Sequence, residues 1–433
     1  MVYILVILIA ALLFVSFYTT GKDLFAPANI LLITFLISLI CAIYNISVWN
    51  FDISGYTVFL IFISLFISFL CNSYYHRVFN LGEIRTNYGN KTIEPINYIP
   101  LVFFVVFMLV CVFSQYKAIK SIGSDNFTAL MHIYRQATAY GNGNVNVNPL
   151  SSTMSNVATA ITYITLFNLI YNFEYKGKIY KLFNLTIIML WVVLFFLQGT
   201  RFEVFSMPIA AFILIYLKKI HERGRYKKLS VLQLAKILII ALILLYAFYA
   251  IKDLVGRRSD QTIIEYLTSY LGGSIPLFDS FIKEPIHDLK VFGQETFYSL
   301  NNGLIRRGFI NSPLYSYNKE FRSIQGVDIG NVYTALRDYY HDFGFVGMIL
   351  LHTLFSAFYS WFYEKQKVKG SYFCILLLSR LYYCVVFYMF SNSFFSRIIS
   401  FSFISELIIM WILYVLLIEK KIRFRFGTSK GKL

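Results

Sequence analysis

The sequence predicts an all-α polytopic membrane protein with about 11 transmembrane helices and one large outer loop. Of its 433 residues, 58% are hydrophobic and only 14% are charged. A soluble globule of this composition would expose far too much apolar surface to water, whereas a protein that faces lipid has no such difficulty. The apolar residues also gather in segments of about 20 residues, the length that a helix needs to cross a bilayer.

These apolar segments follow one another along the chain. They lie near residues 2–18, 24–48, 57–73, 98–116, 151–173, 180–198, 202–219, 231–251, 342–363, 371–390 and 398–419. The first segment has neither a basic region before it nor a small-residue cleavage site, so we expect a retained span rather than a signal peptide. The chain then divides into residues 1–251 with helices 1 to 8, residues 252–341 as the outer loop, and residues 342–433 with helices 9 to 11 and a basic cytoplasmic tail.

The orientation follows from the short loops that are rich in Lys and Arg, because such loops remain in the cytoplasm. These loops are residues 176–181, 218–228, 365–369 and 420–432. The N-terminus and the connections at residues 49–56, 117–150, 198–201, 252–341 and 391–397 are then outside. Since the net charge of +17 is largely this topogenic Lys and Arg, we do not expect nucleic-acid binding.

Within the outer loop, residues 260–278 have the pattern of an amphipathic helix that lies on the bilayer. Apolar residues recur at helical spacing after Asp260, which is a residue type that caps helix N-termini. Gly272, Gly273 and Pro276 should then break this helix.

Residues 331–347, NVYTALRDYYHDFGFVG, form a polar segment that leads into the apolar segment at 342–363. In a helix, Arg337, Asp338, His341 and Asp342 would share adjoining faces of about two turns. Charged groups beside lipid are costly, so we interpret this cluster as a reactive site at the membrane surface. The alternative is that these residues cap the helix and that the acidic residues pair with Arg337.

Arginines mark the predicted outer side. They are Arg201 in a tight hairpin, Arg257 and Arg258 beyond the eighth span, Arg337 and Arg397. A further arginine, Arg380, lies near the middle of the predicted span 371–390. Each has a structural alternative, such as pairing of Arg201 with Glu203 or Glu406, or of Arg380 with a buried carbonyl. Together they are better explained by an anionic ligand, because arginine binds phosphate oxygens through a planar, bidentate fork.

Catalytic motifs of other enzyme classes are missing from the sequence. It contains no GxSxG, P-loop or HExxH motif, and no Asp-x-Asp pair of the kind that holds a metal against a nucleotide sugar. Residues 284–288, EPIHD, contain potential ligands, but a proline interrupts the helix that metal-ligand spacing would require. We therefore expect neither a metal nor another cofactor, and the candidate bases are Asp338, His341 and Asp342, with Glu295 and Asp279 elsewhere in the outer loop.

Several of these features together resemble the Wzy-type polymerases that join oligosaccharide repeat units of bacterial O-antigen and capsule. The resemblance lies in the many spans with a late outer loop, and in the segments GTR at 199–201, YLGGSIP at 270–276 and NVYTALRDYYHDFG at 331–344. It covers most of the chain. Such polymerases are similar in fold to metal-independent, membrane-embedded C-type glycosyltransferases.

The resemblance implies a function and a set of site residues. On the outer face of the bacterial cytoplasmic membrane, a growing glycan would leave undecaprenyl pyrophosphate and pass to a sugar of the incoming lipid-linked unit, without a cofactor. Arg201, Arg257, Arg258, Arg337 and Arg380 would bind the pyrophosphate, and Asp338 or His341 would accept the proton. Asp342, Tyr333 and Asn331 would support them. Besides the lipid-linked oligosaccharide and the bilayer, a chain-length regulator is a candidate partner.

Two other functions remain open. An O-antigen ligase would use the same arginines and base but a different acceptor, the lipid A core. A flippase for lipid-linked oligosaccharide, or another transporter, would instead require inverted repeats and charged residues through the depth of several spans. In the sequence, only Arg380 is placed deep in an apolar segment, which favours the enzyme.

Overall fold

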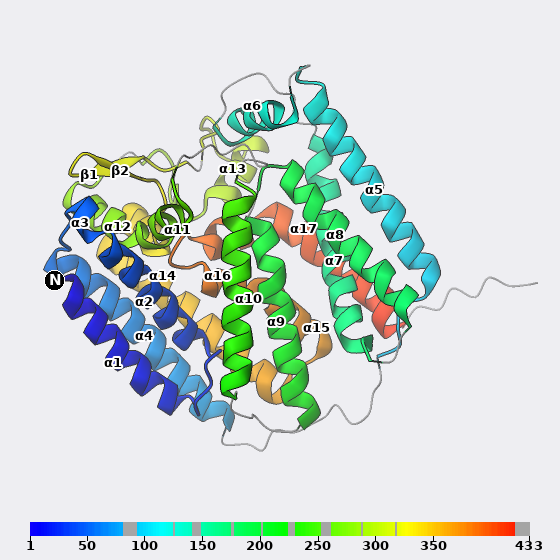
Figure 1. Ribbon diagram of the computed structural model, residues 1–433, viewed down its shortest axis with the longest axis horizontal. Coiled ribbons are helices and arrows are strands. Elements are labelled where there is room, and N and C mark those ends of the chain that lie inside the picture. Colours follow the sequence, from blue (N-terminus) through cyan, green and yellow to red (C-terminus); the bar gives the residue numbers. More distant parts are fainter. Residues whose placement is uncertain are drawn as a thin grey trace, which may run out of the picture.

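The computed structural model describes residues 1–80, 93–123, 126–140, 149–174, 177–200, 202–223, 230–252, 261–286, 289–316 and 318–420. Within these residues, ten helices are long and apolar enough to cross a membrane. The predicted class, a helical multi-span membrane protein, is therefore confirmed. Figure 1 shows most of the long helices running roughly alongside one another, with short elements gathered at one end.

The long helices have the following bounds: α1 (Val2–Thr19), α2 (Pro27–Tyr44), α4 (Gly55–Asn80), α5 (Tyr98–Lys120), α7 (Pro149–Asn172), α8 (Lys178–Leu197), α9 (Phe202–Arg223), α10 (Val231–Ala250), α14 (Ala335–Lys369) and α17 (Phe401–Tyr414). The shorter elements are α3 (Ile46–Trp49), α6 (Phe127–Tyr140), α11 (Ile263–Gly272), α12 (Ser274–Lys283), α13 (Tyr298–Arg306), β1 (Arg322–Ile324), β2 (Val327–Gly330), α15 (Tyr372–Leu381), α16 (Tyr383–Val386), η1 (Phe394–Ile398) and η2 (Val415–Glu419).

The apolar segment predicted at 371–390 does not form one long span. Its helix α15 ends at Leu381, and the four-residue α16 follows after Tyr382. Arg380 therefore lies in the last turn of a short helix rather than in the middle of a continuous one. Hydropathy alone could not reveal this break, because the residues on both sides of it are equally apolar.

Contacts between the connections agree with the predicted sidedness. The N-terminal amino group lies 3.0 Å from the Asp52 carboxylate, and Lys283 Nζ donates to the Asp52 carbonyl at 3.0 Å. The N-terminus, the α3–α4 connection and α12 thus lie together, at the end that we call the outer side. In contrast, Glu94 before α5 pairs with Lys420 after η2 at 2.6 Å.

The outer loop contains more structure than the sequence predicts. Its first helix, α11, is capped by Thr262, whose side chain accepts from the Glu265 backbone N–H in a reciprocal capping box, and not by Asp260, which lies outside the described residues. A Cβ on Gly272 would lie 2.6 Å from the Ala42 backbone nitrogen, so this glycine permits the close packing of α11 on α2. Pro276 does not end the helical region, because it lies in the first turn of α12, where proline is tolerated.

A small antiparallel hairpin, β1–β2, departs from the all-α prediction. Its turn residues Gln325 and Gly326 both have positive φ, 50° and 79°, as in the two-residue turns that connect strands with a right-handed twist. The hairpin packs against α12 through Arg322, which donates to the Ser280 carbonyl at 2.9 Å and to the Glu284 carbonyl at 2.7 Å.

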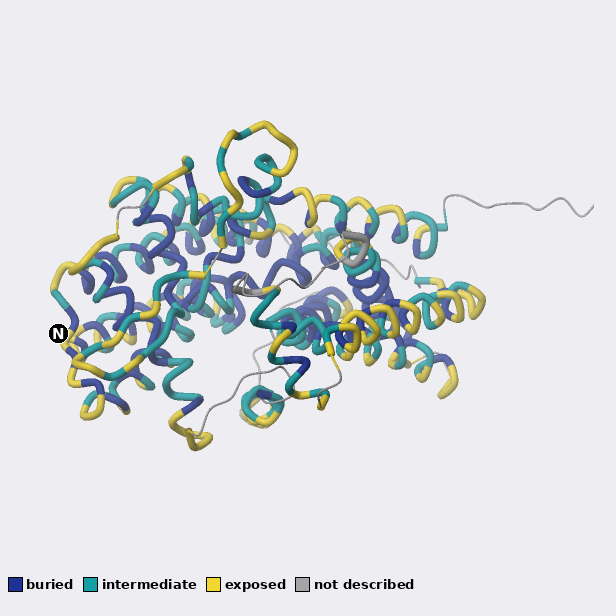
Figure 2. Tube along the Cα trace, turned by 90° about the horizontal axis from the view of Figure 1, so that it is seen from above, coloured by how far each residue is buried: buried dark blue, intermediate teal, exposed yellow. Residues whose placement is uncertain are grey.

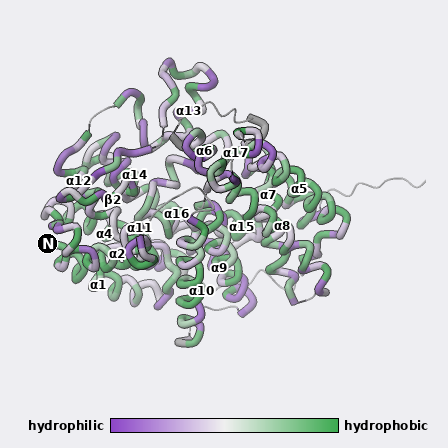
Figure 3. Tube along the Cα trace, turned by 45° about the horizontal axis from the view of Figure 1, so that its top comes forward, coloured by the Kyte–Doolittle hydropathy of each residue, from purple (hydrophilic) through white to green (hydrophobic). Residues whose placement is uncertain are grey.

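The buried residues lie mainly in the middle of the helical body and the exposed ones at its periphery, as Figure 2 shows. In the apolar window of α10, none of the residues is buried, whereas 67% of the window in α7 is buried. Figure 3 shows that hydrophobic residues dominate the long helices, while hydrophilic ones gather around α12, β2 and α13. This distribution is what a lipid-facing bundle with a polar outer cap requires.

Candidate functional site

The predicted polar cluster lies on a short helix at the start of α14. Gly344 interrupts α14 with φ 63° and ψ −162°, a conformation that residues with a side chain rarely adopt. Residues 335–343 thus form about two turns set apart from the long span behind them. The Ala335 N–H donates to the Tyr388 carbonyl at 2.9 Å, which joins this short helix to the segment after α16.

Arg337 is the cation at the centre of the cluster, and its side chain is only 1% exposed. Its guanidinium forms an ion pair with Glu295 and a second one, at 2.7 Å, with Glu320. The guanidinium also lies over the Phe281 ring, 4.5 Å from its centroid. A buried arginine is an anion-binding group, and here two carboxylates of the protein itself are the bound anions.

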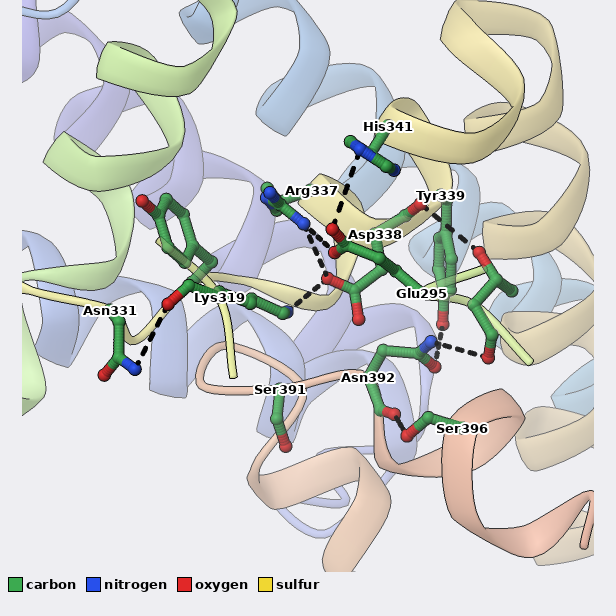
Figure 4. A network of polar contacts seen from close by, with 12 residues as sticks. Glu295, Lys319, Asn331, Arg337, Asp338, Tyr339, His341, Ser391, Asn392 and Ser396 are labelled. Atoms are coloured by element: carbon green, nitrogen blue, oxygen red, sulfur yellow. Dashed lines mark hydrogen bonds and ion pairs between the residues drawn. The ribbon is translucent and has the colours of Figure 1, made fainter. Parts of the chain in front are cut away.

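Asp338 is buried completely, and its carboxylate forms an ion pair with Lys319 (Figure 4). Lys319 comes from the segment before β1, so a contact across the outer loop neutralises this candidate base. The Asp338 carbonyl also accepts a hydrogen bond from Thr296 Oγ1 at 3.3 Å.

His341 and Asp342 form a hydrogen-bonded pair, with His341 Nδ1 2.9 Å from Asp342 Oδ1. The other carboxylate oxygen of Asp342 accepts backbone N–H groups of Glu295 at 3.0 Å and Thr296 at 2.6 Å. His341 Nε2 faces a Glu295 carboxylate oxygen at 3.7 Å. The carboxylate of Asp342 can therefore orient the imidazole toward Glu295, as in sites where a carboxylate positions a histidine base.

Besides Asp342, the predicted supporting residues Asn331 and Tyr333 contact the segment that carries Lys319. Asn331 Nδ2 donates to the Lys319 carbonyl at 3.5 Å, and Tyr333 Oη donates to the Glu320 carbonyl at 3.1 Å. Burial raises the pKa of Tyr333 above the ordinary value of a phenol, so its hydroxyl remains a donor.

A second group of polar side chains supports the cluster from the segment after α16. Asn392 accepts a hydrogen bond from Tyr339 Oη at 3.2 Å and donates to the Thr296 carbonyl at 3.1 Å. It thereby connects the short helix with the loop that carries Glu295. No pattern in the sequence indicates a role for Asn392, and the only signal for Lys319 and Glu320 is the charged run KEFR at 319–322.

Arg380 belongs to a different group of side chains. Its Nε donates to Glu406 at 2.8 Å, its Nη2 lies 3.5 Å from Glu203, and its guanidinium lies over the Tyr163 ring. Among the structural alternatives considered, pairing with a buried carbonyl was wrong, because two carboxylates are its partners. Arg397 shares Glu203 at 3.1 Å but is 43% exposed.

Three of the predicted pyrophosphate ligands, Arg201, Arg257 and Arg258, lie outside the described residues. The turn before Arg201 is described, and Gly199 adopts φ 71° there. The structure thus brings together Arg337, Asp338, His341 and Asp342, and it places Arg380 with Glu203 and Glu406 instead.

A third buried ionic cluster lies at the other end of α14. Lys367 Nζ contacts Asp23 at 2.8 Å and Glu364 at 3.3 Å, and Glu364 also pairs with His76 at 3.2 Å. Halfway along the same helix, His352 is fully buried and its Nδ1 lies 2.5 Å from Tyr388 Oη. The expectation that Arg380 alone lies deep in an apolar segment was therefore wrong, because His352, Glu364 and Lys367 are buried as well.

Comparison with protein families, with characterised proteins and with solved structures finds no match to this chain. In the part of the chain that the structure describes, no group of His, Cys, Asp and Glu side chains is arranged to hold a metal ion.

Proposed function

We propose that the protein polymerises undecaprenyl-pyrophosphate-linked oligosaccharide repeat units on the outer face of the bacterial cytoplasmic membrane. The observation that carries this proposal is a buried arginine, Arg337, within one cluster that also holds Asp338, His341 and Asp342, at the outer end of a membrane-spanning helix. An anion-binding group beside candidate bases, at the start of a helix that is apolar and long enough to cross a membrane, suits transfer of a glycan from a lipid carrier.

In this mechanism the acceptor hydroxyl oxygen attacks the anomeric carbon of the donor glycan, and the bond between that carbon and the pyrophosphate oxygen breaks. The bonding electrons leave with undecaprenyl pyrophosphate, whose added charge Arg337 would stabilise. His341 or Asp338 would take the hydroxyl proton, and Asp342 would orient the imidazole. Arg201, Arg257 and Arg258 remain proposed pyrophosphate ligands from the sequence, and Arg380 is a more remote candidate.

Ligation to a lipid A core would use the same donor chemistry, and the cluster does not distinguish the two acceptors. Transport has one specific observation in its favour. The buried groups Asp23, Lys367 and Glu364 at one end of α14, His352 midway and Arg337 at the other end place polar side chains along the whole helix. Such a distribution is known from transporters, where intramembrane ionisable groups line a pathway.

Analysis of the surface glycan in a deletion strain separates these functions. For a polymerase, we expect the ladder of glycan lengths to disappear and a single repeat unit to remain on the cell surface. A ligase deletion would keep long chains on the lipid carrier, and a flippase deletion would trap single units on the inner leaflet. A normal ladder in the deletion strain would exclude the proposed function.

A further inference from the structure

The described structure shows the candidate site with its charges already satisfied by its own side chains. Arg337 is paired with Glu295 and Glu320, and Asp338 is paired with Lys319. The side chains of Arg337 and Asp338 are 1% and 0% exposed. A pyrophosphate oxygen or a sugar hydroxyl cannot reach either group until some of these partners move.

The partners that can move belong to one short segment, residues 318–321, which we call the latch. Lys319 and Glu320 are consecutive, and they cover the two adjacent site residues Asp338 and Arg337 with the opposite charge in each case. The next residue, Phe321, is 66% exposed, so apolar burial does not fix the latch. Charged pairs and a few hydrogen bonds hold it in place, and such contacts can be exchanged for those of an ionic ligand.

The hairpin that follows the latch has contacts of its own with α12. Arg322 fastens the start of β1 to the carbonyls of Ser280 and Glu284 on α12. The latch backbone, in contrast, has hydrogen bonds to side chains: Asn331 and Tyr333 donate to the Lys319 and Glu320 carbonyls, and the Asn318 N–H donates to Ser316 Oγ. Arg322 Nε also pairs with the Glu320 carboxylate at 3.2 Å, so a movement of the latch exchanges this ion pair, while the contacts of Arg322 with the Ser280 and Glu284 carbonyls hold the hairpin in place.

We propose that the latch closes the site in the absence of substrate and that the anionic pyrophosphate group of the donor opens it. The ligand replaces the Glu320 carboxylate on Arg337. Because Lys319 is the neighbour of Glu320 in the chain, displacement of Glu320 also moves Lys319 and exposes Asp338. The inference rests on the proposed function, and it explains how a site with buried reactive groups can be both protected from water and accessible to substrate.

The test uses the full-length protein in lipid nanodiscs with inorganic pyrophosphate as the probe. The variants are Glu320→Gln, which cannot act as a counter-ion, and Glu284→Gln as a matched control, because Glu284 is an exposed acidic residue of the same outer loop. Binding is measured by calorimetry, and opening is measured by hydrogen exchange of the backbone amides of residues 318–321, in the wild type as well as in the variants.

We expect Glu320→Gln to bind pyrophosphate on the order of tenfold more tightly, because the ligand no longer competes with a carboxylate. Pyrophosphate should also speed exchange of the latch amides in the wild type, while Glu284→Gln should behave as the wild type. The latch proposal would be wrong if the wild type and Glu320→Gln bound pyrophosphate equally tightly, or if bound pyrophosphate did not speed exchange of the latch amides. Neither result would contradict the proposed function. If pyrophosphate bound to none of the proteins, both the latch and the proposed anion site would be overturned.

Discussion

Asp342 holds His341 from one side and the Glu295 loop from the other. Its Oδ1 lies 2.9 Å from His341 Nδ1, while its Oδ2 accepts two backbone N–H groups, from Glu295 and Thr296. One buried carboxylate therefore sets both the direction of the imidazole and the position of the loop opposite it. Through these contacts one side chain connects residues that are 47 positions apart in the sequence.

Replacement of Asp342 by Asn should disturb both functions at once. An amide has one acceptor oxygen, so its NH₂ group would face either the loop N–H groups or the imidazole. We expect a loss of about 1–3 kcal/mol in stability, since hydrogen bonds to a charged group are removed, and at least a tenfold loss of turnover. Thermal denaturation of the purified protein and an assay of polymer formation measure the two effects. The control is Asp328→Asn in the exposed hairpin, which should change neither; unchanged turnover in Asp342→Asn would exclude the positioning role.

Arg337→Lys keeps the charge but loses the planar fork that contacts Glu295 and Glu320 simultaneously. Because a lysine ammonium cannot form the paired, in-plane contacts of a guanidinium, we expect most of the activity to be lost while the protein still inserts and accumulates. Immunoblotting of membranes and the length distribution of the surface glycan give the two readouts. A normal glycan ladder from Arg337→Lys would show that bidentate binding is not needed.

The proposed role of Arg201 rests on the sequence alone, and the same substitutions test it. Its place in the hairpin between α8 and α9 predicts that Arg201→Lys accumulates normally but loses most polymer formation. A normal ladder from Arg201→Ala would remove this residue from the proposed pyrophosphate site.

Arg380 should contribute chiefly to stability. It is buried, and removal of its charge in Arg380→Met leaves the buried Glu406 carboxylate without its cation and removes one of the two arginine partners of Glu203. Breaking a buried ion pair in this way typically costs about 3–5 kcal/mol. Arg397→Met is the matched control, because it removes the half-exposed partner of the same Glu203 and should cost less than about 1 kcal/mol. Equal thermal stability of the two variants would contradict the structural role of Arg380.

Gly344→Ala tests the break between the short helix and the span. Nothing lies within 4 Å of the position that its Cβ would occupy, so the expected effect is backbone strain alone, about 1–3 kcal/mol. We expect the short helix to reorient and polymer formation to fall. Gly177→Ala is the control, since its Cβ would also meet no atom within 4 Å but its φ is −65°. If both variants were fully active, the break would not be needed for the site.

The sequence predicts most of the spans because they are continuous apolar segments, although the segment at 371–390 is broken. It predicts a polar helix within 331–347 because Arg337, Asp338, His341 and Asp342 recur at helical spacing, and this helix begins at Ala335. The hairpin at 322–330 was missed, although Gln325-Gly326 between short alternating residues is a turn signal. The partners of these groups could not be predicted. Lys319, Glu320 and Glu295 reach the site through the path of a long loop, and only tertiary contacts determine that path.

We propose that the cluster at the start of α14 transfers a glycan from lipid pyrophosphate. The most direct test is polymerisation of purified undecaprenyl-pyrophosphate-linked repeat units by the purified protein in liposomes, with Asp338→Asn and His341→Ala beside the wild type. We expect the wild type to produce a ladder of chain lengths, and at least one variant to bind the donor normally yet form no polymer. Full turnover by both variants, or no polymer from the wild type with an authentic donor, would contradict the proposed role of this cluster in glycan transfer.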